Sequence, residues 1–140
     1  MQQIRIMNYH FGAKSRIKSK KQITQIFKSN TSGFVYPIKF LYTLNEDHEL
    51  GTAQVLITVP KRGFKLAVNR NKIKRLIRES YRLHKPEFEK TLLENRIAID
   101  LAFIYTGKNS CDFNQIDSCM ERIIYSVERK LSRNNVKVAH

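Results

Sequence analysis

The sequence contains little cysteine, with Cys111 and Cys119 as its two thiols. Two thiols are too few for a disulfide framework, and their spacing is not that of a paired CxxC metal site. This scarcity excludes the small disulfide-stapled domains of secreted proteins. We therefore expect both cysteines to be small packing residues in a reducing compartment.

Long hydrophobic runs are also lacking. No apolar stretch approaches the roughly 18 residues of a membrane-spanning helix, and the opening MQQIRIMNYH has no apolar centre of the kind found in signal peptides. We therefore expect a cytoplasmic protein without a membrane partner. The length of 140 residues fits one domain over 1–140, too small to hold a separate catalytic domain. The polar segments 1–13 and 132–140 are expected to be flexible tails.

The sequence shows no constellation of catalytic side chains. Its histidines are scattered at His10, His48, His84 and His140, without an HxxxH pair, paired carboxylates or a glycine-rich phosphate loop. Asp100 lies within an apolar segment, where a structural hydrogen bond is a better expectation than a catalytic base. We predict no catalytic residue and no metal site on the protein itself.

Positive charge, by contrast, is abundant. The formal net charge is +14, and between Lys61 and Lys85 ten Lys and Arg residues accompany one carboxylate, Glu79. A second basic cluster lies within the first thirty residues and contains Arg5, Lys14, Arg16, Lys18, Lys20, Lys21 and Lys28. Such an excess predicts a polyanionic partner.

Hydrophobic periodicity predicts an alternation of helices and strands. In chain order these are a helix at 17–29, strands at 36–45 and 53–61, a basic helix ending near Lys85 and Pro86, a short helical piece at 86–95, a strand at 96–107 and a helix at 113–131. The strand at 96–107 is the most apolar and is expected at the centre of the sheet. The order α-β-β-α-β-α predicts an α+β fold, a single-domain α/β sandwich around a small mixed sheet.

The basic helix separates into two faces at 100° per residue. An apolar stripe contains Ile73, Leu76, Ile77, Ser80 and Tyr81. The opposite face, called here the basic comb, contains Asn71, Lys74, Arg75, Arg78 and Arg82. Lys61 and Arg62 extend this surface from the preceding loop. The comb is about 16 Å long, which matches several successive phosphates rather than one small anion.

Two other interpretations of the comb fit its sequence less well. A merely solvated helix face usually interleaves both signs of charge, which this stretch does not. A basic amphipathic helix on a membrane needs an exposed apolar stripe, whereas here the flanking strands need that stripe as cover.

The stretch AVNRNKIKRLIRESYR resembles the signature of the protein subunit of bacterial ribonuclease P. That signature centres on Arg-Asn-x-x-Lys-Arg-x-x-Arg, which here is Arg70, Asn71, Lys74, Arg75 and Arg78. The resemblance covers the order of elements from about residue 16 to residue 131. Two departures are Lys65-Leu66, where many members have Gly-Asn, and Ile23, where an aromatic residue is common.

The resemblance implies an accessory subunit of an RNA enzyme. The partners would be the catalytic RNA subunit and precursor tRNA, whose 5′ leader is removed by metal-dependent cleavage on the RNA. Magnesium would be held mainly by RNA rather than by the protein, and no protein partner is implied. The family also implies a left-handed βαβ crossover, against the usual hand. The implied RNA contacts are Lys61, Arg62, Arg70, Asn71, Lys74, Arg75, Arg78 and Arg82.

The resemblance further implies that Phe27, Tyr42 and Phe40 line a cleft for the leader. Independently, Tyr36, Ile38, Phe40 and Tyr42 share one face of a strand, and aromatic faces beside positive charge can stack unpaired bases. An aromatic strand face can equally belong to the core. Two other classes of protein also stay open. One is a structural RNA-binding protein of the ribosome or of its assembly, and the other is a free-standing nuclease.

Overall fold

The computed structural model describes residue 12, residues 15–29 and residues 31–138. The expectation of a flexible tail at 1–13 therefore lies almost wholly outside the described residues, as do His10 and His140. In chain order the elements are α1 (Lys20–Lys28), β1 (Ser32–Val35), β2 (Ile38–Leu44), β3 (Ala53–Thr58), α2 (Ala67–Glu94), β4 (Ile99–Tyr105) and α3 (Phe113–Val138).

The strands form one mixed sheet in the order β1-β2-β4-β3. β2 pairs antiparallel with β4, and β3 pairs parallel with β4 on its other side, joined to it through α2. β4 is therefore internal, as its apolar sequence predicts, because a strand covered on both faces needs apolar side chains on both.

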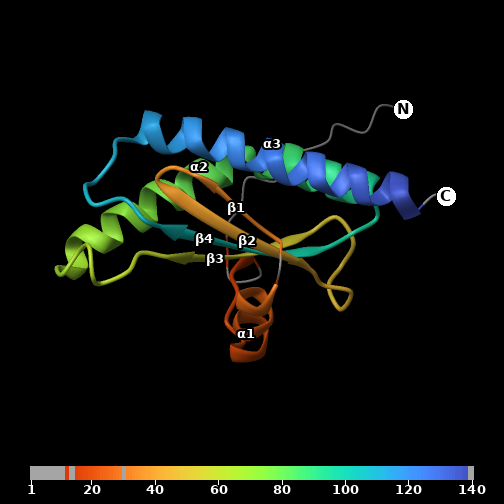
Figure 1. Cartoon of the computed structure of the whole chain (residues 1–140), viewed down its shortest axis with the longest axis horizontal. Coiled ribbons are helices and arrows are strands. Elements are labelled where there is room, and N and C mark those ends of the chain that lie inside the picture. The colour runs from red at the N-terminus through yellow and green to blue at the C-terminus, as the bar shows by residue number, and fades with distance from the viewer. Residues whose placement is uncertain (1–11, 13–14, 30, 139–140) are drawn as a thin grey trace.

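The helices cover both faces of the sheet, with α2 and α3 on one face and α1 on the other (Figure 1). The larger core lies under α2 and α3 and takes alternate residues of each strand, such as Val55, Leu101 and Phe103. A smaller core lies under α1 and contains Ile17, Ile26, Leu41 and Ala102. The predicted α/β sandwich is thus confirmed.

β1 was not predicted, because its four residues contain too little apolar sequence to distinguish them from a turn. Ser32–Val35 pairs antiparallel with β2, so the observed order is α-β-β-β-α-β-α. Gly33 lies opposite Phe40, and a Cβ at this position would overlap the Phe40 ring. Glycine is therefore needed at this strand position to admit the Phe40 side chain.

The predicted helix break at Pro86 is wrong, because α2 continues through it to Glu94. A proline inside a helix costs about 3 kcal/mol, since it removes one backbone hydrogen bond and crowds the preceding turn. Beyond Pro86, however, Phe88 and Leu92 are fully buried and extend the stripe that begins at Ile73. Burial of these two large side chains offsets that cost.

α3 extends beyond the predicted end at Leu131 as far as Val138. Residues 132–138, which were expected in the C-terminal tail, therefore have a helical backbone. No proline or glycine interrupts this segment, so adding residues to an existing helix meets little resistance. Within the described part of the chain, no helix is both long and apolar enough to cross a membrane.

Candidate nucleic-acid interface

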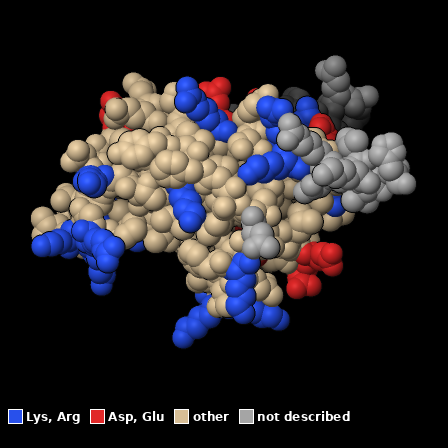
Figure 2. Space-filling model, in the orientation of Figure 1, with Lys and Arg blue, Asp and Glu red and all other residues tan. Residues whose placement is uncertain are grey.

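The two faces of α2 are arranged as its sequence predicts. Ile73, Ile77 and Tyr81 are buried in the core with the sheet, and Leu76 is partly buried. Ser80 is also buried, and its hydroxyl donates to Asp117 of α3. The members of the basic comb are exposed or half-buried. Figure 2 shows that Lys and Arg side chains gather around the start of α2 and on α1. Lys61 and Arg62 are exposed in the loop before α2 and extend the comb.

Arg82 is the member of the comb that forms an ion pair within the described part of the chain. Its Nη2 lies 2.6 Å from Glu79 Oε1 and its Nε lies 3.0 Å from Oε2, a bidentate ion pair one turn apart. The Arg82 guanidinium lowers the pKa of Glu79 accordingly. Glu79 therefore does not offset Lys74 and Arg75, neither of which has an ion pair with any described residue.

Arg70 has an internal role that its sequence position did not reveal. Its Nη1 donates hydrogen bonds to the backbone oxygens of Phe64, at 2.7 Å, and Lys65, at 2.9 Å. α2 begins after Leu66 without a side-chain cap and without an acidic residue in its first turn. Arg70 thus holds the loop before the helix in place. The uncapped start also leaves the positive end of the helix dipole beside the comb.

Arg16 joins the comb across a small cavity at the edge of β3. The cavity measures about 180 Å³, and its basic lining residues are Arg16, Lys74 and Arg78. Burial lowers the pKa of Arg78, and the nearby Arg16 and Arg75 charges lower it further. The buried Nε of Arg78 has no hydrogen-bond partner among the described residues. An anion at this position would relieve the repulsion and supply an acceptor.

Arg16 was not among the predicted RNA contacts. The signal that could have identified it was the N-terminal basic cluster. Its place beside α2 follows from long-range pairing, since Arg16 forms a parallel bridge with Val55 of β3 and Ile17 N donates to the Val55 oxygen at 3.0 Å. That pairing has no local sequence signature.

The structure does not bring the three predicted cleft aromatics together. Phe27 is 50% exposed on α1, whereas Phe40 and Tyr42 are 1% and 3% exposed in the core under α2 and α3. Side chains alternate along β2, so only residues such as Leu41 face α1. Phe40 and Tyr42 share a strand face as predicted, but that face is core rather than a surface open to a leader.

Tyr42 carries a buried hydroxyl without a hydrogen-bond partner among the described residues, and burial raises its pKa. Since an unsatisfied buried hydroxyl is costly, Tyr42→Phe should leave the free energy of unfolding unchanged or raise it by up to about 1 kcal/mol. Urea denaturation of both proteins tests this. A loss of more than about 1 kcal/mol would show that the hydroxyl has a stabilising partner.

Asp100 is fully buried on the α1 face of the sheet and accepts hydrogen bonds, as the sequence predicts. Asn45 Nδ2 donates to its Oδ2 at 2.9 Å, and Gln22 Nε2 of α1 lies 3.4 Å from both carboxyl oxygens. The same Gln22 nitrogen donates to Gln54 Oε1 at 2.7 Å and lies 3.0 Å from His48 Nε2. This Asp100 network joins α1 to β3, β4 and the β2–β3 loop.

The cysteines are packing residues, as expected. Cys119 is buried, and its thiol donates to the backbone oxygen of Val35 at 3.0 Å. Burial raises its pKa to about 11, so the thiolate is disfavoured. Within the described residues, no group of three His, Cys, Asp or Glu side chains could hold a metal ion.

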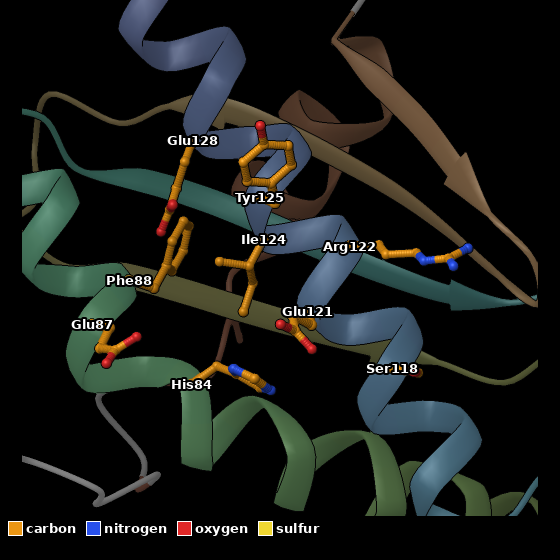
Figure 3. A pocket seen from close by; sticks show the side chains of 9 residues that line it. All are labelled: His84, Glu87, Phe88, Ser118, Glu121, Arg122, Ile124, Tyr125 and Glu128. Carbon is orange, nitrogen blue, oxygen red and sulfur yellow. The ribbon is translucent and has the colours of Figure 1, made fainter.

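A second pocket, of about 610 Å³, lies between α2 and α3 (Figure 3). Glu87 of α2 and Glu121 and Glu128 of α3 line it, and burial raises the pKa of Glu128. His84 at its margin has Nε2 3.0 Å from Asp117 Oδ1. Three carboxylates repel phosphate, so this pocket is unsuited to a nucleic-acid backbone.

Comparison with known proteins agrees with this geometry. The family model described as Ribonuclease P matches residues 11–135. The chain is 29% identical to the ribonuclease P protein component of Porphyromonas gingivalis strain W83, covering 87% of this chain and 89% of that protein. It is 30% identical to the component from Borreliella burgdorferi, over 84% and 93% of the two chains. The solved structure of Staphylococcus aureus RNase P protein matches with a TM-score of 0.65 at 25% identity, over 81% and 94%.

Proposed function

Since the chain belongs to the ribonuclease P protein family, we propose that it binds the catalytic RNA subunit through the basic comb and assists removal of the 5′ leader from precursor tRNA. Lys61, Arg62 and Asn71 extend or complete this contact surface. Because the RNA partner and its tRNA substrate are made and processed in the cytoplasm, we place the protein there.

The observation that carries the proposal is the unbalanced charge along one face of α2. Lys74 and Arg75 lie on one turn of α2 and Arg78 lies on the next. Arg16 adds a fourth positive charge beside them, and Glu79 is occupied by Arg82. Like charges at this spacing repel each other in the free protein. Phosphates of an RNA backbone would neutralise several of them at once, and arginine can hold phosphate oxygens in pairs.

We place hydrolysis itself on the RNA subunit. Hydrolysis of a phosphodiester needs charge stabilisation at the phosphate, and Mg²⁺ prefers the oxygen ligands that RNA phosphates and waters provide. The protein would lower the repulsion between the two RNAs and so favour substrate binding at a low magnesium concentration. In this division of roles, the comb binds the RNA subunit and α1 contacts the 5′ leader of the precursor tRNA.

Phe27 is the aromatic residue best placed to contact the leader. It is half exposed on α1, where Lys20, Lys21 and Lys28 are also exposed. An exposed ring beside positive charge suits an unpaired base. Ile23, the other residue considered on this helix, is partly buried in the core under α1 and offers no ring.

Phe27→Ala should therefore reduce the preference for precursor over mature tRNA by about 1–3 kcal/mol, the usual range for one stacked base. Binding of the RNA subunit alone should not change. Equilibrium binding of both tRNA forms to the assembled enzyme measures the effect. Phe34→Ala, at a similarly exposed ring on β1, is the matched control. Equal loss for both tRNAs would contradict a leader contact.

The test of the proposed function is cleavage of a 5′-extended precursor tRNA at low magnesium. The reaction is run with the RNA subunit from the same genome, with the protein, and with both. Cleavage at the mature 5′ end that requires or strongly gains from the protein supports the proposal. Absence of any gain would favour a structural RNA-binding protein, and cleavage by the protein alone would indicate a nuclease site on the chain.

A further inference from the structure

A large apolar pocket lies beside the basic comb, and of the RNA contacts assigned above only Arg62 lines it. It measures about 790 Å³ and lies between the β3–α2 loop and the segment that follows β4. Its lining residues are Pro60, Arg62, Gly63, Phe64, Tyr105, Thr106, Gly107 and Lys108. It is therefore at the carboxyl ends of two parallel strands, where ligands commonly bind in α/β sheets, and its volume is that of a small-molecule site.

Two aromatic rings form the body of the pocket. The centroids of Phe64 and Tyr105 are 5.7 Å apart, with the ring planes inclined at 57°. Tyr105 is almost fully buried, and its hydroxyl donates to the backbone oxygen of Asn109, which fixes the ring. A Cβ on Gly107 would lie 2.8 Å from the Tyr105 hydroxyl, so glycine permits this close approach. The pocket is thus preorganised rather than collapsible.

The rim of the pocket is basic, and none of its eight lining residues is acidic. Arg62 and Lys108 are exposed on opposite loops. Arg70 supports the Phe64 wall, since it donates to the backbone oxygens of Phe64 and Lys65. A residue of the basic helix therefore fixes the loop that carries an aromatic wall. A purely apolar ligand would not need a basic rim. A nucleobase attached to a phosphate backbone matches both the aromatic wall and the basic rim.

We propose that this pocket receives an unpaired nucleobase of the RNA subunit, whose neighbouring phosphates contact Arg62 and Lys108. The proposal rests on the proposed function, because it assumes that the comb binds that RNA. Base stacking in the pocket would then add to the electrostatic contacts between the comb and the RNA phosphates. The base would stack on Phe64, since that ring is only partly buried and Tyr105 is not accessible.

The test compares Phe64→Leu with Phe64→Tyr. Leucine keeps an apolar side chain of similar size at a partly buried position, whereas tyrosine keeps the ring. Phe64→Leu should weaken binding of the RNA subunit by about fivefold or more, and Phe64→Tyr should bind as the wild type does. The salt dependence should be unchanged in both, because no charge is lost. Tyr125→Leu, at an exposed ring on α3, is the control.

Ultraviolet crosslinking of the wild-type complex, followed by mass spectrometry of the peptides, supplies a second measurement that does not depend on variant stability. A nucleotide attached to Phe64 or within residues 105–108 supports the proposal. Crosslinks confined to other peptides, or a Phe64→Leu protein that binds as tightly as the wild type, would overturn it. Failure of the wild-type protein to bind the RNA subunit at all would instead reject the proposed function.

Discussion

The double variant Arg75→Ala/Arg78→Ala is expected to bind the RNA subunit about 10- to 100-fold more weakly than the wild type. Both side chains lie on the comb, and the buried Nε of Arg78 has no partner among the described residues. A loss of that size corresponds to about 1.4–2.7 kcal/mol for two phosphate contacts, which is close to the usual net contribution of about 1 kcal/mol for each hydrogen bond. The slope of log affinity against log salt should fall by about two.

Arg122→Ala is the matched control for that variant. Arg122 is an exposed arginine on α3, at the margin of the acidic pocket and away from the comb. Its removal changes the net charge by one without removing a comb contact, so it should alter the salt slope by much less than one unit. If the double variant kept the wild-type slope, Arg75 and Arg78 would not contact phosphates.

Asp100→Ala should have the largest effect on stability, lowering the free energy of unfolding by about 2–4 kcal/mol. The carboxyl group is fully buried and accepts from Asn45 and Gln22. Alanine would remove an acceptor from both half-buried amide groups, and it would leave a void between α1 and the sheet. The midpoint of urea denaturation should fall while its slope stays constant.

Asp100→Asn provides the comparison for this effect. It keeps the size of the side chain and one acceptor oxygen, so it should cost less than Asp100→Ala. Near-wild-type stability of Asp100→Ala would mean that the Asp100 network contributes little and that α1 is held chiefly by apolar packing of Ile23 and Ile26. Reduced cleavage without reduced stability would instead point to a functional role for the carboxyl group.

Much of the fold could be predicted because local pattern and tertiary environment agree. The apolar run at β4 is central, and the stripe from Ile73 to Tyr81 is buried. The misses occur where tertiary packing overrides local preference. Gly33 lies in a strand because Phe40 needs the space, and α2 passes Pro86 because Phe88 has a core to enter. Neither reason is visible within a short window of sequence.

The sequence predicted where the basic side chains of the candidate site lie, but not which groups they bind within the protein. Spacing alone placed Lys74, Arg75 and Arg78 on one face. Spacing could not show that Arg70 binds backbone oxygens or that Arg82 holds Glu79. The aromatic residues illustrate the same limit, since the alternation along β2 groups Phe40 with Tyr42 but does not say which face of the sheet they occupy.

The position of β4 in the chain has a consequence for protein synthesis. β4 pairs with both β2 and β3, yet it follows α2 in sequence. During translation the basic helix therefore leaves the ribosome before the strand that completes the sheet beneath it. Until β4 and α3 have emerged, the apolar stripe of α2 lacks much of its cover, and its positive charges are near the most abundant RNA in the cell. Rapid closure of the sheet would limit the time spent in that exposed state.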